Sequence, residues 1–301
     1  MKDCIRPSKR TMLFYLLPGI ALYLFVFILP ALMAIGLSLF KFSSIKNFTF
    51  IGLKNYMLLT RDTNVWLALK NNLFLVAVSL VGQIGIAFLL ACLMTSRSAG
   101  LVNAFRTSIY FPVTLSAVVI GYVWKFVFDY NYGILAEILR ALGQADAIQP
   151  WLAQSSTVMS FVCIPLIWQY VGFHLVIIMS AMTTIDKGVF EMADIDGANA
   201  LQRARYITFP LIRGTLITCA MLCVSANMKV FDHIMAMTNG GPGYASNVLA
   251  LYAYNVSFKQ TNMGYGSTIS VLILVVTTIL FVLTSRLTSL GNGRAAGSLA
   301  G

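Results

Sequence analysis

Residues 191–210, EMADIDGANALQRARYITFP, are the longest richly polar stretch of an otherwise apolar chain. Charged side chains make up only 10% of the protein, yet they crowd this region. Between positions 186 and 205 they are Asp186, Lys187, Glu191, Asp194, Asp196, Arg203 and Arg205. Charges are costly in hydrocarbon, so this stretch must lie outside the lipid while its apolar flanks lie within it.

The local sequence predicts a helix, a turn and a second helix. Residues 189–196 are good helix formers. Gly197 tolerates a positive φ and is expected to end that helix. Residues 198–206 then form the second helix, and Pro210 suits the first turn of the membrane span that follows. The stretch is therefore expected to lie as a compact knob on the membrane surface.

The composition of the whole chain predicts a helical membrane protein. Of its 301 residues 58% are hydrophobic, and the mean hydropathy is +0.81. The apolar residues form long runs rather than the ten-residue alternating segments of a β-barrel. The basic N-terminus precedes an apolar run that is too long for a signal peptide, so an uncleaved first span is expected.

Charge-free windows place six spans in a single transmembrane domain, residues 1–301. The approximate ranges are 12–40, 72–96, 107–127, 157–183, 208–230 and 267–286. The fifth is the weakest, because only fifteen uncharged residues separate Arg213 from Lys229 and about 20 are needed to cross. It can still cross if these two side chains extend toward opposite head-group layers.

The basic residues predict the orientation. If both termini, the loop around Arg97 and Arg106, and the loop 186–210 share one side, that side holds twelve of the 21 Lys and Arg residues. The opposite loops, 41–70, 129–156 and 230–266, hold seven. The termini are therefore expected to be cytoplasmic. Because the basic residues are scattered over span ends, no nucleic-acid partner is expected.

Five positions of the polar stretch carry a resemblance. Glu191, Ala193, Gly197, Ile207 and Pro210 have the spacing of the EAA loop, so the chain resembles the membrane subunits of binding-protein-dependent ABC importers. Met192 and Phe209 depart from the pattern. In that family the loop docks on a cytoplasmic ATPase, which implies coupling roles for Glu191, Ala193, Asp196, Gly197, Ala198 and Pro210. An ordinary amphipathic loop between spans is the alternative.

Further motifs narrow the resemblance to the carbohydrate branch, which includes maltose and glycerol-3-phosphate permeases. They occur in the family's order over nearly the whole chain: Leu17-Pro18, residues 52–56 (GLKNY), Tyr132-Gly133, Trp151-Leu152, residues 195–198 (IDGA), residues 238–242 (TNGGP) and Gly264-Tyr265. The resemblance implies an all-α, polytopic protein with six transmembrane helices and the ABC importer (MetI-like/MalF-like) permease fold. It also implies a role in importing sugars or oligosaccharides.

The resemblance implies several partners. The chain has no G-x-x-x-x-G-K-[ST] phosphate loop, so ATP and Mg are expected in a separate ATPase and no cofactor is expected here. The family pattern is a heterodimer with a second permease subunit, two ATPase subunits, and an extracellular or periplasmic solute-binding protein. The chain is then a multi-pass protein of the bacterial cytoplasmic (inner) membrane.

Polar side chains in the late spans are candidates for the solute path, because such groups tend to face the interior of a helix bundle. They are Gln169, His174, Ser225, Asn227 and Lys229, with Asp232 at the outer edge. Each of them could equally satisfy a neighbouring helix. Lys125 and Lys229 suit either an acidic solute or the membrane interface.

The outer loops have two patterns. Residues 41–70 are expected to be extended and then helical. Residues 129–133 are turn-like and precede an amphipathic stretch from Ile134 to Leu142. The loops are too short for a separate domain, so a platform for a partner is the expected role.

Other functions find little support. The sequence contains no catalytic constellation or metal-ligand cluster, and its cysteines lie mainly in spans. A secondary transporter would need coupling carboxylates in the spans, where none are found. A membrane enzyme would need a nucleophile or metal set. A scaffold subunit is harder to exclude, although the polar residues of the late spans argue against it.

Overall fold

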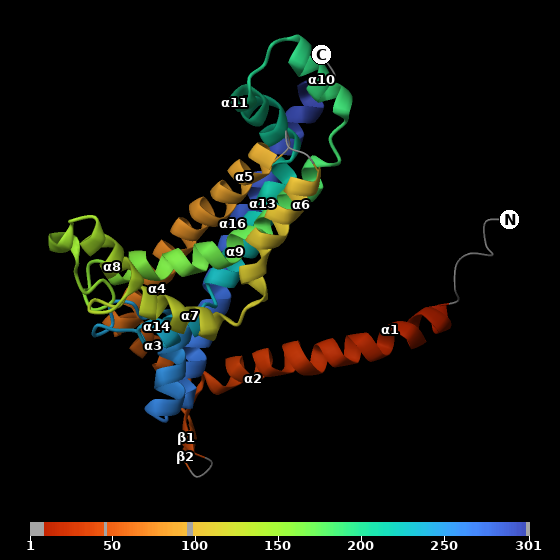
Figure 1. Ribbon diagram of the computed structural model, residues 1–301. Helices are drawn as coiled ribbons and strands as arrows, with labels where there is room; N and C mark the ends of the chain where they lie inside the picture. The colour runs from red at the N-terminus through yellow and green to blue at the C-terminus, as the bar shows by residue number, and fades with distance from the viewer. Residues whose placement is uncertain (1–8, 45–46, 95–98, 299–301) are drawn as a thin grey trace. The chain divides into compact units, whose positions relative to one another are not determined.

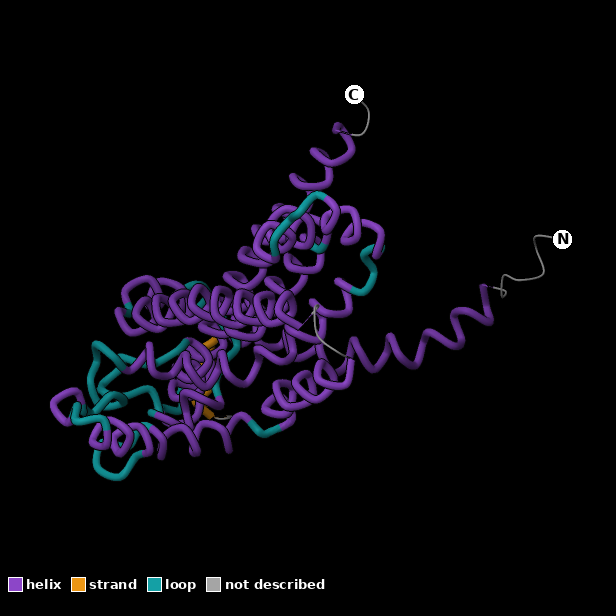
Figure 2. The backbone as a smooth tube through the Cα atoms, turned by 45° about the horizontal axis from the view of Figure 1, so that its top comes forward, coloured by secondary structure: helices purple, strands orange, loops and turns teal. Residues whose placement is uncertain are grey.

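The computed structural model describes residues 9–44, 47–94 and 99–298. The chain divides into two compact units, Met1–Asp62 with Ala253–Leu272, and Thr63–Tyr252 with Ile273–Gly301. Figure 2 shows that helix dominates, which confirms the helical class. Lys2, Cys4, Arg6, Arg97 and the end of the expected span 72–96 lie outside the described residues.

The elements are bounded as follows. The early helices are α1 (Lys9–Tyr23), α2 (Leu29–Leu37), α3 (Lys54–Arg61), α4 (Thr63–Ser79), α5 (Ile86–Met94), α6 (Ala99–Tyr110), α7 (Ala117–Val127) and α8 (Ile134–Ala141). The later helices are α9 (Val158–Met182), α10 (Lys187–Ile195), α11 (Ala200–Gln202), α12 (Phe209–Leu211), α13 (Arg213–Asn227), α14 (Asp232–Met237), α15 (Leu249–Tyr254) and α16 (Met263–Ser298). π-Helical segments are Leu24–Ile28, Leu80–Gly85, Arg203–Thr208 and Asn255–Lys259, and 3₁₀ segments are Phe111–Thr114 and Ala145–Ala147.

Four helical stretches are long and apolar enough to cross a membrane: Thr11–Leu37, Thr63–Met94, Val158–Met182 and Met263–Arg286. Two further stretches are bent pairs, Gly100–Thr114 with Ala117–Val127 at 99° and Ala200–Leu211 with Arg213–Asn227 at 76°. Among the described residues the count is thus four spans, or six if each bent pair is one span. The spans expected at 107–127 and 208–230 fall on these two bent pairs, and they stay predictions.

Backbone conformation explains both bends. Leu115 and Ser116 are extended, with ψ of 149° and 133°, so the helix is interrupted between the halves of the first pair. At the second bend Ile212 leaves the helical region with ψ of 12°. Pro210 lies in α12, on the polar side of this break. The sequence predicts Pro210 in the first turn of the next span, whereas it lies near the end of the helical stretch Ala200–Leu211, and the chain turns once more before α13.

The all-α prediction misses a hairpin of β1 (Phe40–Ser44) and β2 (Asn47–Phe50). Phe40 pairs with Phe50 and Phe42 with Phe48, so phenylalanines recur at every second position. The rings of Phe40 and Phe48 stack with centroids 4.3 Å apart. Period-two aromatic spacing is typical of strands. The hairpin and α3 confirm the extended-then-helical connector.

Two sequence motifs meet within the first unit. Asn55 Nδ2 donates to the carbonyls of Ser38 at 2.8 Å and Phe40 at 3.1 Å, holding the hairpin against the end of α2. Gly264 lies against the Phe40 carbonyl, where a Cβ would not fit. The hydroxyl of Tyr265 donates to Asp62 at 2.7 Å. The GLKNY and Gly-Tyr motifs therefore form a structural joint.

The second unit is a bundle in which α4, α5, α6 and α13 pack on α9 or on one another (Figure 1). Its dry core contains Ala87, Ala91, Leu175, Ile178 and Cys219. Within this unit α10 and α11 lie at one end of the bundle, and α8 lies at the other (Figure 1). The polar stretch is therefore far along the bundle from the loop after α7.

Gly121 allows α7 to approach α14 closely. A Cβ on Gly121 would lie 2.7 Å from the Cβ of Ala236. We expect Gly121→Ala to destabilise the protein by about 1–3 kcal/mol through overpacking. Gly214→Ala is the matched control, because nothing lies within 4 Å of its added Cβ. Thermal unfolding in detergent checks this, and equal midpoints for the two variants would contradict the close packing.

Candidate functional site

The polar stretch forms the predicted helix, turn and helix. Asp186 caps α10 by accepting a hydrogen bond from the Gly188 N–H at 3.0 Å. Ala193 is buried against the loop. Gly197 has φ of +72°, and the N–H of Ala198 donates to the Ala193 carbonyl at 2.9 Å. This is the glycine-terminated helix end that the sequence predicts.

The second half of the stretch has caps of its own. The side chain of Asn199 accepts from the Gln202 N–H at 2.9 Å, and Gln202 Oε1 accepts from the Asn199 N–H at 2.8 Å. An Asn followed three residues later by a Gln is the sequence pattern of a capping box, but this box was not among the predictions. Arg203 pairs with Asp194 and so links the second half to α10. The loop is therefore braced internally.

The exposed surface of this loop carries both acidic and apolar side chains. Glu191 and Asp196 are exposed. Four large apolar side chains are exposed beside them: Met192 at 60%, Ile195 at 86%, Leu201 at 76% and Tyr206 at 70%. Exposed apolar side chains on a braced helical knob are typical of a protein-binding surface. Phe209, the other departure from the motif, instead packs its ring 6.0 Å from that of Phe88.

A network of buried polar side chains centres on Gln83 in the π-helical segment between α4 and α5. Its Nε2 donates to the carbonyl of Leu166 in α9 at 3.2 Å. Its Oε1 accepts from His174 Nε2 at 3.2 Å and from the Cys223 thiol at 3.4 Å. Gln83 thus joins its own segment to α9 and α13, and the candidate His174 of α9 is hydrogen-bonded to it. The Nδ1 of His174 has no partner among the described residues.

The candidate Asn227 continues the network at the end of α13. Its Oδ1 accepts from the Ser79 hydroxyl at 3.2 Å, and its carbonyl accepts from Asn72 Nδ2 at 3.1 Å. Asn72 Oδ1 accepts in turn from the N–H of Leu249 at 2.8 Å. Asn71 donates to the carbonyls of Ala245 and Asn247. The two asparagines of α4 therefore tie down the chain after the Gly-Gly-Pro turn.

The candidate Gln169 holds the first helix break together. Its Nε2 donates to the carbonyl of Leu115, at the break before α7, at 3.0 Å. Because its oxygen can only accept, His233 Nε2 donates to it across 2.7 Å. Both Gln169 and His233 are buried. One side chain on α9 thus joins α7 to α14.

The other three candidates lie around the end of α13. Ser225 is half-buried, whereas Lys229 and Asp232 are exposed. Ser225 lies in α13, Lys229 follows the end of that helix, and Asp232 begins α14, so the helix is interrupted between them. The structure thus separates the six candidates into three buried, hydrogen-bonded residues and three accessible ones.

Sequence reasoning missed Asn71, Asn72, Gln83 and His233, which complete these contacts. The available signal was an amide or imidazole inside an apolar run, the same signal that selected Gln169 and Asn227. The predicted Gly-Gly-Pro turn is itself ordered by Ser246, whose hydroxyl donates to the Gly241 carbonyl at 2.6 Å. Within the described residues no group of His, Cys, Asp and Glu is arranged to hold a metal ion.

Comparison with known proteins agrees with the bundle of membrane helices described above. A family model described as "Binding-protein-dependent transport system inner membrane component" matches residues 83–289. The chain belongs to that family, so it is an integral inner-membrane component of a binding-protein-dependent transport system.

Individual relatives extend the similarity over nearly the whole chain. The probable ABC transporter permease YurN of Bacillus subtilis is 31% identical over 96% of this chain and 99% of its own length. The multiple sugar-binding transport system permease MsmF of Streptococcus mutans is 29% identical, covering 80% and 82%. A bacterial alginate ABC transporter, solved with an alginate pentasaccharide-bound periplasmic protein, has the same fold at 22% identity, with a TM-score of 0.80 and coverage of 93% and 95%.

Replacing Gln169 separates structural from solute-binding roles. Gln169→Leu removes two interhelical hydrogen bonds and leaves Leu115 and His233 without these partners. Such bonds contribute roughly 0.6–1.7 kcal/mol each in membranes, so we expect about 1–3 kcal/mol of destabilisation. Chemical unfolding in detergent measures it, with Ser225→Ala as the control. Unchanged stability together with a raised KM for transport would instead identify Gln169 as a solute contact.

Proposed function

We propose that the chain is the permease subunit of an ATP-driven importer of sugars or oligosaccharides. It forms half of the translocation path, and the loop 191–210 couples it to a separate ATPase. The observation that carries this proposal is the braced knob around Gly197, which presents acidic and apolar side chains at one end of a membrane bundle. The sequence spacing of the EAA loop coincides with this knob.

The shape of the loop suits mechanical coupling. The Asp194–Arg203 pair and the Asn199 capping box make the knob a stiff body. The same chain runs through α12 and the bend at Ile212 into α13. A displacement of the docked knob is therefore transmitted to α13 through helical segments. Glu191, Asp196 and Gly197 shape the docking side, Ala193 and Ala198 close the turn, and Pro210 precedes the bend.

The proposal assigns the partners. A second permease subunit completes a heterodimeric path, two ATPase subunits hold ATP and Mg, and an extracellular or periplasmic protein delivers the solute. The N- and C-termini lie on the cytoplasmic side with the loop 191–210. This orientation follows the distribution of Lys and Arg between the loops.

A carbohydrate suits the accessible residues. Ser225, Lys229 and Asp232 offer hydroxyl, ammonium and carboxylate groups within eight residues of the chain, and sugars are bound by such polar groups beside aromatic rings. The ring of Tyr170 lies 6.4 Å from that of His233, the neighbour of Asp232. The sugar-transporting relative and the alginate transporter support the same solute class.

Gly197→Asp tests the coupling role. The substitution strains a position with φ of +72° by about 1–2 kcal/mol and adds a charge to the docking side. We expect the ATPase to be lost when the transporter is purified through this chain. Gly143→Asp is the matched control, since Gly143 also has φ of +72° and nothing lies near its Cβ position. Loss of the ATPase from both variants, or from neither, would contradict the assignment.

Lys229→Met tests the solute path. An exposed lysine contributes little to folding, but a hydrogen bond from a charged group contributes about 1.5 kcal/mol or more to binding. We expect ATP-dependent sugar uptake into proteoliposomes to lose about tenfold in kcat/KM. Lys125→Met, at the exposed end of α7, is the control. Equal losses of kcat/KM in the two variants would show that Lys229 does not contact the solute. Uptake without ATP would contradict the proposal that the protein belongs to an ATP-driven importer.

A further inference from the structure

The loop after α7 carries apolar side chains that the proposed function does not use. In α8 and its C-terminal cap, Ile134, Ile138 and Leu142 follow one another at intervals of four residues. They are 62%, 50% and 67% exposed. Ala136, by contrast, is fully buried. α8 therefore has one apolar side facing the protein and a second apolar stripe facing outward, where a water-facing helix would carry polar residues.

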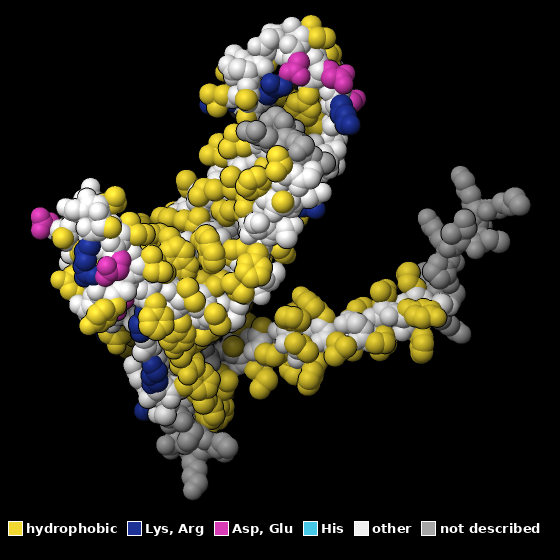
Figure 3. Space-filling view, viewed as in Figure 1, with side chains coloured by type: hydrophobic (Ala, Val, Ile, Leu, Met, Phe, Trp, Pro, Cys, Tyr) yellow, Lys and Arg dark blue, Asp and Glu magenta, His cyan; other side chains and the backbone are white. Residues whose placement is uncertain are grey.

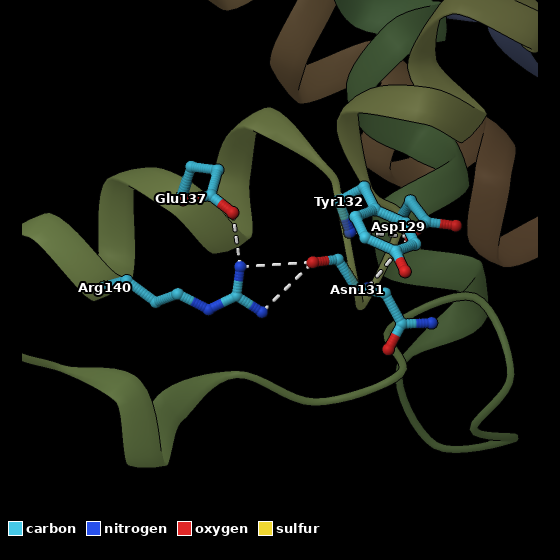
Figure 4. Close-up of polar contacts among 5 residues, drawn as sticks. All are labelled: Asp129, Asn131, Tyr132, Glu137 and Arg140. Atoms are coloured by element: carbon cyan, nitrogen blue, oxygen red, sulfur yellow. Dashed lines mark hydrogen bonds and ion pairs between the residues drawn. The ribbon is translucent and has the colours of Figure 1, made fainter.

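Hydrogen bonds hold α8, which carries the stripe, to the turn that precedes it. The carboxylate of Asp129 accepts hydrogen bonds from the N–H groups of Asn131 and Tyr132 at 2.9 and 3.0 Å, and these bonds lower the pKa of Asp129. Both terminal nitrogens of Arg140 donate to the Asn131 carbonyl at 3.1 Å. Figure 4 shows this guanidinium between the turn and Glu137. The helix and the preceding turn are thus one ordered piece.

The two charges of α8 itself cancel each other. Arg140 and Glu137 form an ion pair within α8, and Figure 3 shows a basic and an acidic side chain together over α8, with hydrophobic ones nearby. The Arg140 guanidinium is already bonded to Glu137 and to the Asn131 carbonyl, so it has few donors left for an acidic partner. The stripe is the uncharged part of the outward surface of α8, so whatever contacts it must be apolar.

The stripe also begins close to the end of a candidate span. The N–H of Gly133 donates to the Asp129 carbonyl at 3.1 Å, and a Cβ on Gly133 would lie 2.7 Å from the carbonyl oxygen of Val127. The first turn of α8 is therefore held against the last turn of α7, which is half of a candidate membrane span. Tyr130 and Tyr132 at this junction are exposed, and tyrosine is enriched at membrane–water interfaces.

We propose that α8 lies on the outer leaflet of the lipid bilayer, with Ile134, Ile138 and Leu142 inserted at the boundary between head groups and acyl chains. Amphipathic helices bury their apolar face about 5–10 Å into this boundary. The paired Glu137 and Arg140 lie on the head-group side. The contact fixes the height of the outer loop relative to the membrane without a protein partner.

Spin labelling tests the contact in the complete transporter, with its partner subunits, in phospholipid nanodiscs. A nitroxide is attached to Ile138→Cys, and its collisions with oxygen and with a water-soluble nickel chelate are compared. Asp146→Cys, on the exposed turn that follows, is the control. The parent protein is labelled in parallel, because Cys92 is half-buried and Cys163, Cys219 and Cys223 are buried.

We expect the label at position 138 to collide more with oxygen than with the nickel chelate, and the label at 146 to show the reverse order. Greater exposure to the nickel chelate at 138 would overturn the proposal in favour of a hydrated surface. Shielding from both reagents would overturn it in favour of a covering protein. Leu142→Cys repeats the measurement one turn further along, so a poorly folded Ile138 variant does not decide the outcome.

Discussion

A polar side chain inside a membrane must find its hydrogen-bond partner in the protein, because the hydrocarbon offers no water. The second unit meets this constraint with amides that bridge helices. Gln83 joins the π-helical segment after α4 to α9 and α13, and Gln169 joins α9 to α14 and to the break before α7. Each amide has both ends satisfied, so the helices it joins are specified relative to one another.

The same constraint explains how broken helices are tolerated. A break frees backbone carbonyls that a continuous helix would satisfy. At the first break the Leu115 carbonyl is taken up by Gln169, and the turn that follows α14 is held by Asn71 and Ser246. Irregular backbone therefore occurs where side chains from neighbouring helices reach it. This arrangement leaves the bundle stiff between its two ends, where the loop 191–210 and α8 lie.

Sequence reasoning succeeded where a property is local. Hydropathy indicates membrane helices, the charges of residues 186–205 exclude that stretch from lipid, and Gly197 has no Cβ to resist a positive φ. The glycine does adopt φ of +72°. The alternating phenylalanines of the hairpin were equally local, but the surrounding apolar runs concealed them.

The sequence by itself thus determined the class of protein, the family and the helix-turn-helix form of residues 191–210. Only the tertiary structure decided which candidate side chains are buried and hydrogen-bonded to other helices. By residue type and hydropathy alone, Gln169, His174 and Asn227 cannot be told from Ser225 and Lys229. Yet each of the three has a hydrogen-bond partner far along the chain, at a separation of 54, 91 and 148 residues respectively. Such partners depend on which helices become neighbours, and hydropathy carries no information about that choice.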